Sequence, residues 1–379
     1  MKIASVECLP VHSGWRKNFV FVRIATDNGL QGIGESTFFS HPEAAAAIAT
    51  SFGEQLIGED PMRTEFHWLR LYRASSMRGM GITGAISAID QALWDIRGKH
   101  FQAPVWQLLG GKVRDKVRAM FVLGYGTPDE VNASARAAVA EGYTALKVLL
   151  FQKNHHLMRH GARLGDLVDR LASLREAVGW EIDIGVELHR NMVPGEAIAL
   201  IREIEPFRPL FVEDPIVPDS VLAFGEVAEK VRVPMAAGER TTTMWEFREY
   251  VEAGGVHHIR PDVGICGGIT HMKKICALAE AHHQGIIPHS VPNGPVAVAA
   301  HVQLGICVPN WEVQEHRPQD RPPFSRAVKK IIPVVNGFFP APEAPGLGVE
   351  LDEEGLKSIP RVERKMDTWL REDGSVAFR

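Results

Sequence analysis

The chain has 379 residues, of which 45% are apolar and 23% are charged, and its formal net charge is −4. This composition excludes disordered, fibrous and disulfide-scaffold proteins. The slight acidic excess argues against a basic groove for nucleic acid, and the absence of an apolar run of about 18 residues argues against a membrane span. Because the four cysteines are sparse and the first residues lack the apolar core of a secretory signal, we expect a reduced protein of the cytoplasm that binds neither nucleic acid nor membranes.

The first 115 residues are predicted to form an α+β domain. Three short apolar runs predict a small antiparallel sheet: 2–6, 19–25 and 30–35. The turn signal Thr26-Asp27-Asn28-Gly29 predicts a hairpin between the second and third runs. Segments with helical spacing follow after Pro42, at 61–74 and at 85–100.

A different pattern starts near Val117, where short apolar runs alternate with amphipathic segments. Eight such runs are predicted strands: 118–123, 143–149, 181–187, 209–213, 233–236, 257–260, 285–288 and 310–313. Strand–helix alternation implies parallel strands with crossover helices, and eight units in about 200 residues favour a (β/α)8-type barrel over 116–340. A doubly wound open sheet uses the same units and is the alternative. The tail, 341–379, is rich in proline and glycine at its start and is predicted to leave the barrel.

Acidic and imidazole side chains recur at the same position in successive strand–helix units. Glu187, Glu213 and Glu239 follow or end three strand runs and are 26 residues apart. Asp262 follows 23 residues later, His289 another 27 and Glu315 another 26. In a barrel these positions lie side by side at the carboxyl-terminal rim, where active sites form.

Neighbouring carboxylates repel one another unless a positive charge lies between them, and a cation with oxygen ligands, of which Mg²⁺ is the usual one, answers this requirement. The alternative is that each acid only caps the helix that follows it. That explanation suits any single residue, whereas the repeated phase favours a site.

Two histidines are placed for proton transfer. His189 lies two residues after Glu187, so strand alternation puts both on one face, and His289 stands four units farther round the ring. One imidazole on each side of a metal is what two-sided proton transfer requires, and Asp262 could orient His289. The alternative is that both are ordinary core histidines.

Several segments together resemble a known family. They are AIDQALWDIRGK at 88–99, APVWQLLGG at 103–111, PLFVEDP at 209–215, AAGER at 236–240, RPD at 260–262, PH at 288–289 and PGLGVE at 345–350. The chain resembles the enolase superfamily in its mandelate racemase subgroup, and most closely the galactonate dehydratase-type acid-sugar dehydratases. The resemblance implies an enolase-like barrel whose N-terminal α+β domain acts as a cap, completed by the C-terminal tail.

The resemblance also implies a reaction. In this family Mg²⁺ binds the carboxylate of an acid sugar, a base removes the α-proton, and the metal stabilises the enediolate. Glu213 and Glu239 match the second and third metal ligands, and Asp262 with His289 matches the base dyad. His189 matches the acid that helps the β-hydroxyl leave, and Glu315 matches a residue that bonds the enediolate oxygen. The product would be a 2-keto-3-deoxy acid, and the family suggests a homo-oligomer.

Two positions depart from the family pattern. The first metal ligand is normally the aspartate of Asp-x-His, where this chain has Glu187-Leu188-His189; we expect Glu187 still to be a ligand. Racemases of the subgroup carry Lys-x-Lys on the second strand, where this chain has Lys147-Val148-Leu149. Lys147 is therefore either a substrate contact or a solvated lysine at the strand end.

The substrate and the reaction outcome stay open at this point. The loop of the capping domain with Trp15 and Arg16 is expected to contact the substrate, although a flexible surface arginine is the alternative for Arg16. The long segment 151–163 is expected to form part of a lid or an oligomer contact. An epimerase, racemase or cycloisomerase using the same enolisation, and a non-catalytic binder of sugar acids, are the alternatives to a dehydratase.

Overall fold

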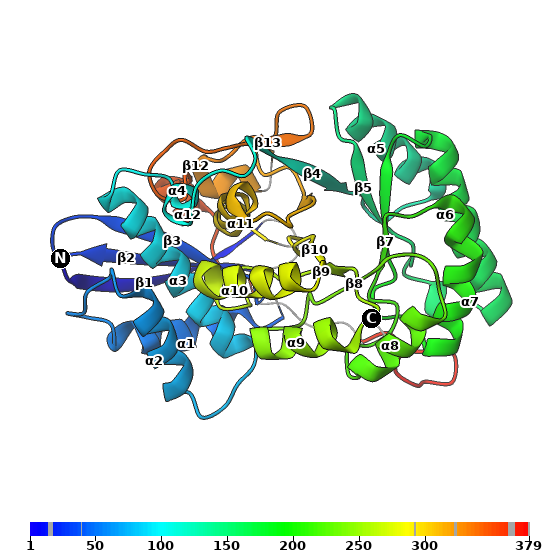
Figure 1. Cartoon of the computed structure of the whole chain (residues 1–379), viewed down its shortest axis with the longest axis horizontal. Coiled ribbons are helices and arrows are strands. Elements are labelled where there is room, and N and C mark those ends of the chain that lie inside the picture. The colour runs from blue at the N-terminus through cyan, green and yellow to red at the C-terminus, as the bar shows by residue number, and fades with distance from the viewer. Residues whose placement is uncertain (14–17, 39, 292, 322–323, 363–367, 378–379) are drawn as a thin grey trace.

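The structure is a computed structural model that describes residues 1–13, 18–38, 40–291, 293–321, 324–362 and 368–377. The N-terminal elements gather at one end of the molecule and the barrel occupies the rest (Figure 1). Within the described residues, no helix is long and apolar enough to cross a membrane.

The N-terminal domain is an antiparallel sheet packed on helices. Its strands pair in the order β1 (Ile3–His12), β2 (Asn18–Thr26) and β3 (Gln31–Ser36). Its helices are α1 (Pro42–Glu54), α2 (Thr64–Ala74), α3 (Met80–His100) and the short α4 (Val105–Leu108). The predicted hairpin forms between β2 and β3, with Gly29 at φ 86°. The long helix α3 packs across β3, which carries Gly32 and Gly34 where the backbones approach most closely.

Eight parallel strands form the barrel. In ring order they are β4 (Lys116–Val122), β5 (Ala145–Leu149), β6 (Asp183–Glu187), β7 (Phe211–Glu213), β8 (Met235–Ala237), β9 (His258–Ile259), β10 (Gly285–Ile286) and β11 (Gln314–His316). β11 pairs in parallel with β4, and a parallel bridge joins Ile286 of β10 to Trp311 just before β11. Because the sheet closes on itself, the fold is a barrel, and the doubly wound alternative is wrong. The last strand lies at 314–316, a few residues beyond the predicted run.

An α-helix follows each of the first seven barrel strands. These helices are α5 (Pro128–Ala140), α6 (His160–Val178), α7 (Pro194–Ile204), α8 (Val221–Glu229), α9 (Met244–Ala253), α10 (Gly268–Ala281) and α11 (Pro295–Cys307). Capping boxes start α5 at Thr127 and α9 at Thr243, and α7 and α11 begin at proline, which is favoured in the first turn. Short 3₁₀ turns occur at η1 (His155–Leu157), η2 (Glu205–Phe207) and η3 (Phe324–Ala327), the last of which follows β11.

The capping domain and the barrel share buried polar contacts. Glu35 of β3 accepts hydrogen bonds from the backbone of Gly294 (2.6 Å) and Ala297 (3.0 Å) at the start of α11. On α3, Asp90 accepts from Thr270 N at 3.0 Å, at the start of α10. These contacts place the end of β3 beside the carboxyl-terminal ends of the barrel strands.

The chain that follows η3, which includes the predicted tail at 341–379, contacts both parts of the molecule. Its elements are β12 (Val328–Lys330), β13 (Phe338–Pro340), β14 (Glu350–Leu351) and α12 (Glu353–Ser358). β13 pairs antiparallel with β4, and Leu347 N donates to Asp95 of α3 at 2.8 Å. The last described residues reach the barrel instead, where Trp369 stacks on His156 of the long segment after β5.

Candidate active site

Six predicted site residues lie at the carboxyl-terminal ends of successive barrel strands. Glu187 and Glu213 are the last residues of β6 and β7, and Glu239 follows β8 by two residues. The other three complete the rim: Asp262 after β9, His289 after β10 and Glu315 within β11. The equal spacing in the sequence arises because each strand–helix unit returns the chain to the same edge of the barrel.

Three glutamates form a compact oxygen cluster. One carboxylate oxygen from each of Glu187, Glu213 and Glu239 lies within 4.8 Å of the others. Glu187 and Glu213 are fully buried, and Glu239 is nearly so. Burial, with the charge of Glu187 nearby, raises the pKa of Glu213 above its usual value despite the opposing effect of Arg260. Oxygen donors of this charge and spacing fit a divalent cation such as Mg²⁺.

Lys147 lies inside this cluster and is only 3% exposed. Its ammonium nitrogen contacts Glu187 (2.8 Å), Glu213 (2.5 Å) and Glu315 (3.1 Å). The alternative of a solvated lysine at the strand end is therefore wrong. Although burial favours the neutral amine, the three carboxylates raise the pKa of Lys147 above its usual value.

Two buried arginines that the sequence analysis did not assign to the site complete the charge balance. Arg260, the first residue after β9, pairs with Glu213 and Glu315. Arg190 pairs with Glu239 and also lies 3.5 Å from Asp214. Arg260 could have been found, since it stands two residues before Asp262 at the end of a predicted strand.

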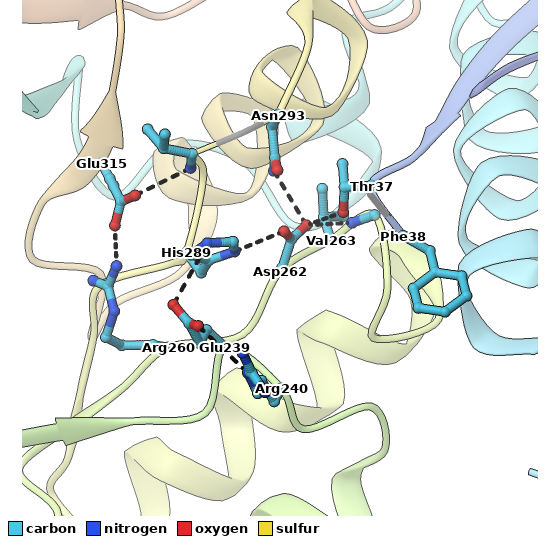
Figure 2. Close-up of polar contacts among 12 residues, drawn as sticks. Thr37, Phe38, Glu239, Arg240, Arg260, Asp262, Val263, His289, Asn293 and Glu315 are labelled. Atoms are coloured by element: carbon cyan, nitrogen blue, oxygen red, sulfur yellow. Dashed lines mark hydrogen bonds and ion pairs between the residues drawn. The ribbon is translucent and has the colours of Figure 1, made fainter. Parts of the chain in front are cut away.

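Asp262 and His289 form a hydrogen-bonded pair (Figure 2). His289 Nδ1 lies 2.9 Å from Asp262 Oδ2, and its Nε2 lies 3.6 Å from Glu239. The second oxygen of Asp262 accepts from Thr37 at 2.9 Å, from Asn293 at 3.1 Å and from the backbone of Gly264 at 2.8 Å. Four donors therefore hold this carboxylate in one orientation.

The charges around the pair shift both pKa values. Although burial favours the neutral ring, Glu239 and Asp262 raise the pKa of His289 to about 9. Burial would raise the pKa of Asp262, but the hydrogen bond and charge of His289 hold it below its usual value. A cation bound at Glu239 would offset the charge of that carboxylate and lower the pKa of His289, so that the ring could accept a proton as a base dyad must.

Thr37 is a site residue contributed by the capping domain. It directly follows β3, and its hydroxyl reaches Asp262 across the domain boundary. No local signal in the sequence marks this threonine, because its partner lies 225 residues away.

His189 lies on a left-handed turn beside the glutamate cluster. His189 and Arg190 adopt φ 52° and φ 64°, and His189 N donates to Glu187 Oε1 at 2.8 Å. Burial and the charge of Arg190 lower the pKa of His189 to about 3, although the charge of Glu239 opposes this shift. A bound carboxylate substrate would add negative charge and favour the protonated ring.

Two of the predicted substrate contacts cannot be placed. Trp15 and Arg16 lie outside the described residues. The segment 151–163 packs against the end of the tail. The ring centroids of His156 and Trp369 lie 5.3 Å apart, and Arg159 forms an ion pair of 2.9 Å with Glu372. This segment therefore joins the tail to the carboxyl-terminal side of β5.

Comparisons with known proteins identify the family of this chain. Residues 6–110 match the N-terminal domain family of mandelate racemase and muconate lactonizing enzyme, and residues 130–355 match the enolase C-terminal domain-like family. The D-galactonate dehydratase of Cronobacter sakazakii is 36% identical over 386 aligned positions, which cover 100% of both chains.

Solved structures give the same result. An enolase from Agrobacterium radiobacter, a candidate galactarate dehydratase with sodium and L-malate bound, superposes with a TM-score of 0.95 at 29% identity and covers 100% of both chains. A candidate dehydratase from Mesorhizobium loti gives a TM-score of 0.88 at 33% identity over 96% of this chain and 99% of that one. The chain therefore belongs to the mandelate racemase and muconate lactonizing enzyme family of the enolase superfamily.

Proposed function

We propose that this protein is a Mg²⁺-dependent dehydratase of an aldonic or aldaric acid. The observation that carries the proposal is the Asp262–His289 pair next to the buried cluster of three glutamates. This arrangement sets a base beside a site for a cation, as removal of a proton α to a carboxylate requires. The dehydratases among the similar proteins support the same reaction class.

The cation would be held by Glu187, Glu213 and Glu239. A bound Mg²⁺ would supply positive charge against the negative charge that develops on the substrate carboxylate during proton removal. Family members use Mg²⁺, and the oxygen-only donor set suits a hard cation.

His289 is proposed to remove the α-proton through Nε2. Its Nδ1 is engaged by Asp262 at 2.9 Å, so Nε2 is the nitrogen left for the substrate. As the α C–H bond breaks, Nε2 takes the proton, and Asp262 stabilises the imidazolium that forms. Glu315 is proposed to bond the carboxylate oxygen that gains charge.

His189 is proposed to supply the proton for the leaving hydroxyl. The β C–O bond breaks, the hydroxyl takes this proton and leaves as water, and a double bond forms between the α and β carbons. The resulting enol then loses its hydroxyl proton, takes up a proton at the β carbon and becomes the 2-keto-3-deoxy acid. Lys147 is proposed to contact the substrate carboxylate, and Trp15 and Arg16 to contact its distal end.

Proton NMR in D₂O with Mg²⁺ and a panel of aldonic and aldaric acids tests the proposal. We expect one acid to be converted to its 2-keto-3-deoxy product. Exchange of the α-proton for deuterium without loss of water would indicate an epimerase or racemase instead. If neither exchange nor conversion occurs although the protein binds Mg²⁺ and the acid, the chain is a non-catalytic binder.

Two further properties belong to the proposal. The family resemblance suggests a homo-oligomer whose partner is a small acid sugar, and the sequence suggests a cytoplasmic location. Light scattering after size-exclusion chromatography measures the assembly directly, and a mass equal to that of one 41.9 kDa chain would contradict the oligomer.

A further inference from the structure

Lys147 contacts the same carboxylates that are proposed to hold the metal. Its ammonium nitrogen lies 2.8 Å from Glu187 and 2.5 Å from Glu213, which are two of the three proposed ligands. The third contact, 3.1 Å to Glu315, joins β5 to β11, the two strands on either side of β4. A positive charge from the chain itself therefore lies where the glutamate cluster needs one.

A lysine and a divalent cation cannot share these oxygens at full strength. An ammonium and a divalent cation drawn to the same carboxylate oxygens repel each other, and the repulsion is stronger in a buried site than in water because the effective dielectric constant is lower. Each glutamate oxygen directed at the ammonium is also an oxygen withdrawn from the cation. Binding of a cation to the cluster must therefore weaken the contacts of Lys147 with Glu187 and Glu213.

Arg260, another buried cation of the site, is held differently. Arg260 binds Glu213 and Glu315 but also donates to the backbone carbonyl of Ile287 at 3.0 Å, which anchors the guanidinium to the barrel wall. The described contacts of the Lys147 ammonium are all carboxylates. An ammonium on a four-carbon stem is a mobile point charge, whereas guanidinium is a rigid fork, so Lys147 is the cation that can move.

We propose that Lys147 is a tethered counter-ion that holds the glutamate cluster together without metal and is displaced when Mg²⁺ binds. The displaced ammonium stays next to Glu315, on the side of the cluster proposed to receive the substrate carboxylate. Metal binding would thereby prepare the substrate site. The inference rests on the proposed metal site, but not on which acid sugar is dehydrated.

The test compares Mg²⁺ binding and thermal stability in wild type, Lys147→Met and Lys147→Gln. Calorimetric titration without substrate should show Mg²⁺ binding at least ten-fold more tightly to both variants, because no internal cation competes. Their melting temperatures in chelator should fall below that of wild type, and saturating Mg²⁺ should recover most of the loss.

Arg175→Met is the matched control. Arg175 is also a buried cation, but its hydrogen bonds go to backbone carbonyls, including Gly179 at 2.8 Å and Ile182 at 2.7 Å. Its loss should destabilise the protein equally with and without Mg²⁺ and should leave the Mg²⁺ affinity unchanged.

Equal or weaker Mg²⁺ binding in the Lys147 variants would overturn the proposal, as would a wild-type protein that binds no Mg²⁺. If the variants do not fold in chelator, folding them in Mg²⁺ decides, and failure of the metal to rescue them also overturns it. Turnover of acid sugars is measured separately in wild type. If wild type turns over an acid sugar but the Lys147 variants bind Mg²⁺ with wild-type affinity, only the proposed role of Lys147 is refuted. If the variants bind Mg²⁺ more tightly but wild type turns over no acid sugar, only the dehydratase proposal is refuted.

Discussion

His289 is held by Asp262 at one ring nitrogen, and Asp262 is in turn held by donors from the barrel and from the cap. Replacing His289 with asparagine keeps a polar side chain but removes the group that accepts the proton. We expect α-proton exchange to fall by about 100-fold or more, the scale of a lost general base. Deuterium incorporation followed by NMR measures this rate.

The control for this variant is His283→Asn, an exposed position whose φ of 58° suits asparagine. Its exchange rate should equal that of wild type. Exchange by His289→Asn at the wild-type rate would remove His289 as the base.

Glu187 shows how the site accommodates a glutamate where the family resemblance leads us to expect aspartate. One of its oxygens accepts from the backbone of His189, and the other contacts Lys147. The side chain therefore folds back toward its own chain, next to the left-handed turn at His189 and Arg190. The longer glutamate is thus matched to the conformation of this loop.

Glu187→Ala should weaken Mg²⁺ binding by about 10-fold or more, because the cluster loses one of three carboxylates. Glu187→Asp should have a smaller effect in the same direction, since the carboxylate is kept but shortened. Calorimetric titration measures both affinities. Unchanged metal binding and turnover in Glu187→Ala would show that this glutamate is not a ligand.

At the scale of elements, β3 and α3 approach more closely than side chains normally allow. A Cβ atom at Gly34 would overlap the backbone carbonyl oxygen of Ala88, and one at Gly32 would overlap that of Ala92. Glycine is required at both positions because the atoms in the way belong to the backbone of α3, which cannot move aside as a flexible side chain could.

Gly34→Ala should therefore lower the free energy of unfolding by about 1–3 kcal/mol, the usual cost of overpacking a core. Gly161→Ala, near the start of α6, is the control because a Cβ there meets nothing within 4 Å. It should be neutral or slightly stabilising, since alanine favours helix. Urea denaturation gives both values, and equal effects would contradict the packing argument.

The elements also show how much of the secondary structure can be predicted from local sequence pattern. Alternating apolar runs predicted the eight barrel strands, and the capping boxes and prolines mark several helix starts. The last strand was placed a few residues early because the apolar run at 310–313 forms only the bridge at Trp311, while β11 begins at Gln314. The residues that pair were decided by closure of the ring against β4, which no local pattern encodes.

At the scale of the whole molecule, the cap is joined to the barrel partly through Asp90, which is buried between α3 and α10. Burial raises the pKa of Asp90 from its usual 3.8 to about 7, although Thr270 opposes the shift. The folded protein therefore binds this proton more tightly than the unfolded chain. The contribution of Asp90 to stability is present below pH 3.8 and is lost as the pH rises through about 7.

Asp90→Asn removes this titration while keeping an acceptor for Thr270. The stability of Asp90→Asn relative to wild type should rise by up to about 4 kcal/mol between pH 4 and pH 8, at about 1.4 kcal/mol per pKa unit. Urea denaturation across this range measures the difference. Asp115→Asn, at an exposed site, should show a constant difference, and a constant difference for Asp90→Asn would contradict the argument.

Local sequence pattern was enough to predict the order of the elements and the end of the barrel at which the site lies. Helical and strand periods are local, and each strand–helix unit has nearly constant length, so Glu187, Glu213 and Glu239 could be assigned to one rim before any contact was known. The same reasoning extended to Asp262 and His289, whose hydrogen bond the structure then contained.

How the charged side chains meet across that rim could not be predicted from local pattern. Lys147 could be interpreted as solvated or as a substrate contact, Arg260 was not assigned to the site, and no local signal marked Thr37 as a site residue. Their partners come from other strands or from the cap. Which side chains meet depends on barrel closure, on the docking of the cap and on the left-handed turn after Glu187. Periodicity specifies the face and the end of a strand at which a residue lies, whereas pairing across a ring is set by packing of the whole chain.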